Sequence, residues 1–168
     1  MPCRKSQSSV ALLLNLAWSY GMESKVRPYI TAALFCEKVL TETDGSISAI
    51  RIADKVTLQM QGPPGMQPMP LPPGTPTPVP IFDLTCFVAL KSGSETPERY
   101  TLRLTFKSPT GKIQGNPVEH AVHLLGKDHG QNFIVRYYIA AQEEGVHWVH
   151  VSVDDEELTR IPLIVVRG

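Results

Sequence analysis

The stretch that decides the fold is ALFCEKVLTETDGSISAIRIADKVTL, residues 33–58. Two apolar segments flank a polar centre that contains Asp44 and Gly45. Asp side chains close turns by accepting hydrogen bonds from their own main chain, and Gly adopts positive φ without strain. The stretch therefore predicts a β-hairpin of two core strands joined at Asp44-Gly45. Its acidic residues are interpreted as parts of the turn and not as catalytic groups.

The second half of this stretch alternates with period two, which is typical of a strand with one buried face. Asp54 alone interrupts the apolar face, and a buried carboxylate requires a hydrogen-bonding or ionic partner. The residues that share the predicted apolar face are Ile50, Ile52, Val56, Leu58 and Met60, with Arg51, Lys55, Thr57 and Gln59 opposite.

Strand signals continue to the end of the chain, and no helix is indicated after residue 22. The predicted strands are residues 29–40, the alternating segment above, and residues 82–90, 100–107, 118–125, 133–141, 146–153 and 158–166. About eight short strands joined by turns predict an all-β, antiparallel, immunoglobulin-like β-sandwich. Trp148 is the expected core plug, and Pro162 requires an edge or a bulge in the last strand.

Size, composition and charge place limits on function. The chain has 168 residues, 42% of them hydrophobic, which is about one globular domain. The 16 basic and 16 acidic residues give no net charge. A neutral chain has no field that would hold a polyanion, so nucleic-acid and anionic-membrane binding are not expected.

Residues 1–21 are interpreted apart from the domain at residues 22–168. They contain a basic Arg4-Lys5 pair before a short apolar run that ends near Trp18, which is too short to span a bilayer. Three interpretations stay open: a leader for export, a misassigned start with Met22 as the true first residue, or a genuine folded segment. The second predicts a cytoplasmic protein, and the first a periplasmic or secreted one.

A proline-rich loop is predicted at residues 61–80, where nine of the 15 prolines lie between Pro63 and Pro80. Proline fixes φ near −65° and cannot donate to a sheet, so this segment predicts an extended loop. It is interpreted either as a docking segment for an aromatic groove or as a stiff connection.

The segments ALFCEKVL, DGSISAIRIAD, FVALKSG and SPTG, followed by a Gly145-Val-His-Trp hairpin that leads to IPLIVV, resemble an uncharacterised bacterial β-sandwich family, a domain of unknown function. The resemblance covers residues 28–166. It implies an immunoglobulin-like fold and a cytosolic bacterial protein with no assigned activity. The leader and the long proline-rich loop depart from the family pattern.

Candidate chemistry is sparse, and no catalytic, cofactor-binding or metal-binding residue is expected. Cys36 lies between Phe35 and Glu37 on a strand and is interpreted as a buried packing residue, with a Cys36–Cys86 bridge as an alternative. His120 and His123, like His147 and His150, are spaced so that a strand puts them on opposite faces. Zinc at His120 and His150, or calcium at the acidic residues 154–157, would need convergence that the spacing does not indicate.

The leading functional hypothesis is a soluble, non-enzymatic β-sandwich that acts through protein–protein contact, by a sheet edge or by the proline-rich loop. The alternative is an exported immunoglobulin-like domain that binds a ligand or carbohydrate, with Trp148, Tyr137 and Tyr138 as stacking surfaces.

Overall fold

The computed structural model describes residues 27–58, 81–127, 129–140 and 143–167, and these residues form nine strands and no helix. The strands follow the period-two pattern of the sequence, so the all-β prediction is confirmed, with one strand more than expected. They are β1 (Tyr29–Thr41), β2 (Ile47–Ile52), β3 (Lys55–Leu58), β4 (Ile81–Lys91), β5 (Glu98–Lys107), β6 (Val118–Leu124), β7 (Gly130–Ala140), β8 (Gly145–Val153) and β9 (Glu156–Arg167).

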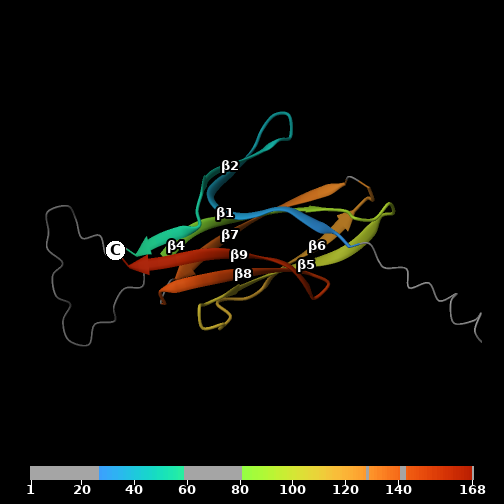
Figure 1. Cartoon of the computed structure of the whole chain (residues 1–168). Helices are drawn as coiled ribbons and strands as arrows, with labels where there is room; N and C mark the ends of the chain where they lie inside the picture. Colours follow the sequence, from blue (N-terminus) through green and yellow to red (C-terminus); the bar gives the residue numbers. More distant parts are fainter. Residues whose placement is uncertain (1–26, 59–80, 128, 141–142, 168) are drawn as a thin grey trace, which may run out of the picture.

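The strands form two sheets (Figure 1). The four-stranded sheet has the order β2-β1-β4-β7 and is antiparallel throughout. The five-stranded sheet has the order β3-β9-β8-β5-β6, and β3 runs parallel to β9. The prediction of an antiparallel sandwich is therefore wrong for the β3–β9 pair. The predictions for residues 1–21 and for the proline-rich loop at 61–80 concern residues outside those described.

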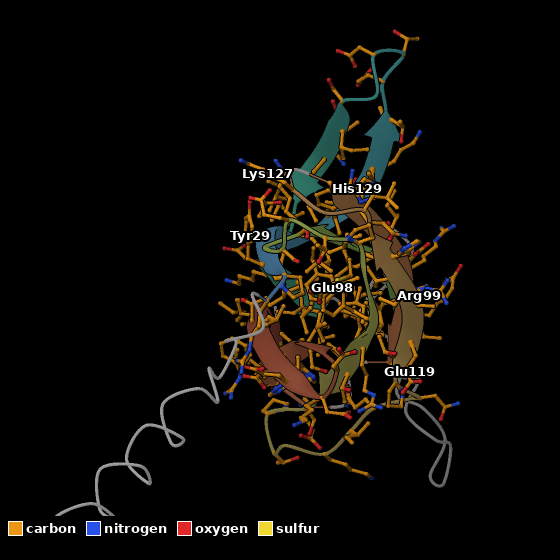
Figure 2. The ribbon with its side chains drawn as sticks, turned by 90° about the vertical axis from the view of Figure 1, so that its right-hand side faces the viewer. Tyr29, Glu98, Arg99, Glu119, Lys127 and His129 are labelled. Atoms are coloured by element: carbon orange, nitrogen blue, oxygen red, sulfur yellow. The ribbon has the colours of Figure 1, made fainter. Side chains whose placement is uncertain are left out.

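The β1–β2 hairpin forms as the sequence predicts. The side chain of Asp44 accepts a hydrogen bond from the main-chain N–H of Ser46 at 2.8 Å, and Gly45 has φ +83°. Hydrogen bonds from the main chain and the side chain of Ser46 hold the pKa of Asp44 below its ordinary value. The hairpin extends beyond the side chains that fill the space between the sheets (Figure 2).

This extension corrects the predicted apolar face of β2. Ile52 is 65% exposed and Ile50 is 40% exposed, so neither lies in the core. Val56, which the sequence placed on the same face, is buried. The reason is that the predicted single strand divides at Ala53-Asp54, where the chain leaves one sheet and enters the other.

Asp54 is explained by this change of sheet. It is exposed, so no buried partner for its carboxylate is required. Its main-chain carbonyl accepts a hydrogen bond from the N–H of Ile164 at 2.7 Å, and the N–H of Ala53 donates to the carbonyl of Phe35 at 2.9 Å. The two bonds attach the crossing chain to both sheets.

The core lies between the sheets and is built from the inward residues of each strand. Leu102 and Leu104 of β5 and Val149 and Val151 of β8 are fully buried. On β8 the alternation puts His147, not Trp148, inside: His147 has no exposed surface, and Trp148 is half-buried on the other face. The prediction that Trp148 fills the core is therefore wrong. The core residue is its neighbour His147, because a shift of one residue along a strand changes the face.

Pro162 lies opposite Trp148, before the residues of β9 that pair with β3. The β3 pairing begins only at Ile164, so β9 has one neighbour at Pro162, and the missing N–H leaves no ladder bond unmade. β9 is thus an edge strand at Pro162, as expected, but not over its whole length.

Gly126 gives a direct test of the packing between the β4–β5 and β6–β7 connections. It has φ +106°, and a Cβ there would lie 2.5 Å from the carbonyl oxygen of Glu95. We expect Gly126→Ala to lower the free energy of unfolding by about 2–4 kcal/mol, from steric overlap added to left-handed strain.

Gly45→Ala is the matched control, because Gly45 also has positive φ but nothing within 4 Å of the added Cβ. It should cost about 1–2 kcal/mol. Urea denaturation measures both variants, and equal losses would contradict the described contact.

Candidate binding groove

The candidate site begins with β7, an edge strand of the four-stranded sheet. It pairs with β4 at eleven consecutive positions, from Ile81 opposite Ala140 to Lys91 opposite Gly130. In the part of the chain that the structure describes, no strand pairs with its other side. An unpaired edge presents a row of main-chain donors and acceptors to another extended chain.

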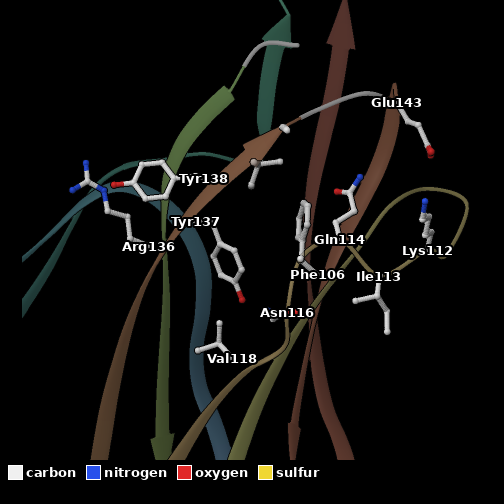
Figure 3. Close-up of a pocket in the computed structure, with 13 residues that line it drawn as sticks. Phe106, Lys112, Ile113, Gln114, Asn116, Val118, Arg136, Tyr137, Tyr138 and Glu143 are labelled. Carbon is white, nitrogen blue, oxygen red and sulfur yellow. The ribbon is translucent and has the colours of Figure 1, made fainter. Parts of the chain in front are cut away.

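A pocket of about 510 Å³ lies along this edge (Figure 3). One wall is five consecutive residues of β7, 136–140, and the other is residues 112–116 with Val118, which connect β5 to β6. Phe106 and Glu143 complete the lining. We call this pocket the β7 groove.

Aromatic rings form the inner part of the groove. The ring of Phe106 lies 6.0 Å from that of Tyr137 and stacks on buried His147 at 5.6 Å with an interplanar angle of 10°. Nε2–H of His147 donates to the main-chain carbonyl of Glu143 at 2.9 Å, since a carbonyl can only accept. The base of the groove therefore consists of packed rings.

Three polar atoms around Phe106 are shielded from solvent and have no hydrogen-bond partner among the described residues. They are the hydroxyl of Tyr137, Oε1 of Gln114 and Nδ1 of His147. Burial raises the pKa of Tyr137 well above its ordinary value, so its hydroxyl keeps the proton and can donate. Buried polar atoms are nearly always paired in folded proteins, so this group is a point where the protein can gain hydrogen bonds.

The outer rim of the groove is charged and aromatic. Nε of Arg136 donates to Oδ1 of Asp83 at 2.7 Å, and this bond holds the pKa of Asp83 below its ordinary value. The guanidinium carbon of Arg136 lies 5.6 Å from the centre of the Tyr138 ring. Arg136 is thereby held on the outer face, away from Tyr137 (Figure 3).

The outer face of the four-stranded sheet carries exposed apolar side chains. Strand register puts exposed side chains of β2, β4 and β7 on this one face. Exposed apolar patches rimmed by polar residues mark interaction sites. The exposed residues are Ile50, Ile52, Ile81, Ile134 and Tyr138.

Cys36 and Cys86 are buried and free, as the packing interpretation predicts for Cys36. The alternative of a bridge between them is wrong, because Cys86 lies opposite Phe35, the neighbour of Cys36, so the two thiols point to opposite faces of the sheet. Burial raises the pKa of Cys36, and raises that of Cys86 to about 12. Neither thiol has the lowered pKa of a nucleophile.

The histidines alternate in the predicted way but do not converge. His120 faces the core and contacts Phe133 at 5.6 Å, while His123 is exposed. His150 lies on the outer face of β8, where Nδ1 is 2.6 Å from Glu157. Within the described ranges, no three His, Cys, Asp or Glu side chains gather in a way that could hold a metal ion.

The acidic residues 154–157 bind other parts of the protein. The side chain of Asp154 accepts the N–H of Thr101 at 2.8 Å, and Asp155 pairs with Arg103. Asp154 and Asp155 both have positive φ, which is the geometry of a two-residue hairpin turn. Glu156 pairs with Arg27, so the run has the contacts of a structural turn.

The stacking residues named from the sequence are only partly brought together. Tyr137 and Tyr138 both line the β7 groove, but their rings point to opposite faces of the strand (Figure 3). Trp148 is not among the residues of the groove. Sequence reasoning missed Gln114 and Phe106, and the clearest available signal was the Ser108–Gly111 turn that starts the connecting loop.

The fold and groove define an all-β protein of two sheets with an open edge strand. The model of a family of unknown function, DUF6941, matches residues 72–166, and the chain belongs to this family. The predicted membership of an uncharacterised family is thus confirmed. The match begins after β3, so it is shorter than the resemblance drawn from the sequence.

Other comparisons add little. The search of curated proteins found no match. Among solved structures, the chain is similar to Pseudomonas fluorescens alkylpurine DNA glycosylase AlkC bound to DNA containing an abasic site analog, with 20% identity and a TM-score of 0.43. The match covers 52% of this chain and 26% of that one, so the chain spans about a quarter of that protein's length. No described segment is a helix long and apolar enough to cross a membrane.

Glu157 provides a pH test of the outer face of the five-stranded sheet. Hydrogen bonds from His150 and Arg160 lower its pKa in the folded protein. A lowered carboxyl pKa stabilises the fold above the ordinary value near 4.5, and this contribution is lost as pH falls through the folded pKa.

Glu157→Gln should therefore cost at most about 1 kcal/mol at pH 7, because solvent screens a half-exposed cluster. The difference from the wild type should shrink as the pH falls from 7 toward 3. Urea denaturation at both pH values measures it, and a difference that grows on acidification would contradict this assignment.

Proposed function

We propose that this protein is a non-enzymatic protein-interaction module that binds an extended segment of another protein along the β7 groove. The observation that carries the proposal is the edge of β7, where five consecutive residues line a pocket and no described strand uses the outer main-chain groups. A peptide that adds to a sheet edge gains main-chain hydrogen bonds, and alternate side chains enter flanking pockets.

The shape of the groove favours a free strand over the edge of another sheet. Residues 112–116 stand across from β7, so an incoming strand has protein on both sides. A β7 strand of a second copy would bring its own 112–116 segment and its own neighbour β4 into the same space. An extended peptide carries neither.

The exposed apolar face next to the groove also supports a protein partner. Tyr138 is 67% exposed and Ile134 is 51% exposed, and both belong to β7. Side chains of an added strand that point outward would lie beside them, since neighbours across a strand pair share a face. Binding would therefore bury apolar area in addition to forming main-chain bonds.

The proposal takes the fold as an immunoglobulin-like sandwich and the compartment as cytoplasmic. The free thiols of Cys36 and Cys86 support a reducing compartment. The carbohydrate-binding alternative has less support, because Tyr137, Tyr138 and Trp148 form no common stacking platform. The docking role of the proline-rich loop at 61–80 concerns residues outside those described.

Blocking the groove tests this function. A phage-displayed library of random 12-residue peptides is selected on the folded chain, and the affinity of each selected peptide is measured by fluorescence anisotropy. Ala140 is exposed and lines the groove, so Ala140→Trp should weaken binding by about tenfold or more, equivalent to about 1.4 kcal/mol.

Ala121→Trp is the matched control, since Ala121 is an exposed alanine on β6, the edge of the other sheet. It should leave affinity within about twofold, because its change stays below about 0.4 kcal/mol. Peptides that bind Ala140→Trp as well as wild type would contradict the proposal. So would a wild-type dimer that Ala140→Trp converts to a monomer in sedimentation, because a second copy would then fill the groove.

A further inference from the structure

The β1–β2 hairpin lacks the packing that the other strands have. After Cys36, β1 pairs with β2 alone, and no described third strand joins these two. This part of the hairpin rises from the four-stranded sheet on the side away from β8 and β9 (Figure 1). We call residues 37–52 the arm. A two-stranded hairpin is marginally stable at best in water, and a covered apolar face stabilises it.

The arm carries exposed apolar side chains on the face that continues the outer face of the sheet. Cys36 lies opposite both Ile52 and Thr85, so these three residues share that face. Ile50 is two residues from Ile52 and points to the same side. Ile52 is 65% exposed and Ile50 is 40% exposed. The arm therefore has an apolar stripe that the described residues leave uncovered.

The adjoining part of the sheet is also apolar. Leu34, Phe87 and Ile134 lie side by side across β1, β4 and β7, on the same face as Ile52. We call these three residues the floor. Ile134 is exposed and Leu34 is half-buried. Because the arm rises on the outer side of the sheet, its apolar stripe and the floor meet at an angle and face the same space (Figure 1).

We propose that the arm and the floor form the interface of a symmetric dimer, in which the arm of each copy lies on the floor of the other. A two-fold axis makes this contact twice, because the same patch of each copy meets the other. Each apolar stripe is then covered by an apolar surface. The inference goes beyond the proposed function, which concerns the β7 groove.

Charge supports a second copy as the occupant. Near the tip of the arm, Glu42 and Asp44 are exposed and have no basic partner among the described residues. Lys38 and Lys91 are exposed on the same face as the stripe and the floor, and no described acidic side chain pairs with them. An arm laid on a second copy brings its acidic tip to this basic surface. The chain thus supplies both halves of the contact.

The dimensions of the arm agree with this arrangement. Eight residues separate Cys36 from Asp44 at the tip, which is about 26 Å of extended strand. Six residues separate Thr85 from Lys91 along β4, or about 20 Å. An arm that lies along β4 of a second copy therefore spans the whole floor.

The dimer leaves the β7 groove open. Ala140 pairs with Ile81, at the end of β4 that precedes Thr85. Thr85 is the last residue of β4 opposite β1, so the arm leaves the sheet there, and the floor lies on the other side of that point. A dimer through the arm and a dimer through β7 would thus cover different residues, and substitutions distinguish them.

Sedimentation equilibrium of the full chain tests the inference with Ile52→Lys. Ile164→Lys is the matched control, because Ile164 is an exposed isoleucine of the other sheet. Circular dichroism establishes that both variants fold. We expect the wild type and the control to be dimers at about 100 μM. Ile52→Lys should raise the dissociation constant about tenfold or more, because the two-fold axis buries two unpaired charges.

Glu42→Lys tests the charge at the tip. It should raise the dissociation constant about threefold or more, since each copy then brings a cation toward the lysines of the other. Glu95→Lys is the matched control, because Glu95 is an exposed acid in the connection between β4 and β5. The control should leave the dissociation constant within about twofold.

A wild type that is monomeric at about 100 μM would overturn the inference. Equal effects of either variant and its control would also overturn it. A dimer that Ala140→Trp dissociates and Ile52→Lys leaves intact would overturn both this inference and the proposed function. If Ile52→Lys dissociates the dimer but no selected peptide is weakened by Ala140→Trp, the proposed function alone is wrong.

Discussion

The eleven-residue pairing between β4 and β7 is the interaction on which both the fold and the groove depend. β4 is one of the two inner strands of its sheet, with β1 on its other side, and its residues 84–88 are all buried. A strand buried on both faces and paired along both sides cannot shift register without exposing apolar side chains. β7 is thereby fixed along its length by one edge, while its other edge faces the groove.

β7 is the longest of the four edge strands in the described sheets, ahead of β6, β2 and β3. Edge strands are commonly shortened, bent or charged, which prevents them from pairing with other chains. β3 has four residues and begins with Lys55, and β2 has six residues and contains Arg51 at φ 53°. β7 has eleven residues, contains neither proline nor lysine, and has its one arginine held by Asp83. A long unprotected edge beside a pocket is consistent with an edge that is used.

The sequence predicts most strands because local signals determine them. The Asp44-Gly45 turn and the alternation in β5 and β8 depend only on neighbouring residues, and their boundaries agree within a few positions. The division at Ala53-Asp54 was missed because alternation continues through it, and only contact with Phe35 and Ile164 shows that the chain changes sheets. For the same reason Ile52 was expected inside and lies outside.

The groove could not be predicted to the same extent. The groove requires β7 to lie at a sheet edge, opposite a loop about 20 residues earlier in the chain. The alternation of apolar and polar residues predicts strands but does not predict their order in a sheet. Tyr137 was named from the sequence as an aromatic binding residue, but Gln114, which also lines the groove, carries no local signal. The sequence predicted that Trp148 faces the core, but His147 does, because neighbouring residues of a strand point to opposite faces. A sheet edge or the proline-rich loop was expected to carry the function, and β7 is the edge that we propose.

The central claim is that the outer edge of β7 is open in the free protein. Amide hydrogen exchange, followed residue by residue by NMR, measures it most directly, because β4 can bond only alternate amides of β7. We expect alternating slow and fast exchange along residues 130–140, with the fast amides becoming slow when a selected peptide is added. Uniformly slow exchange along β7 in the free monomer would contradict it, because the edge would already be paired.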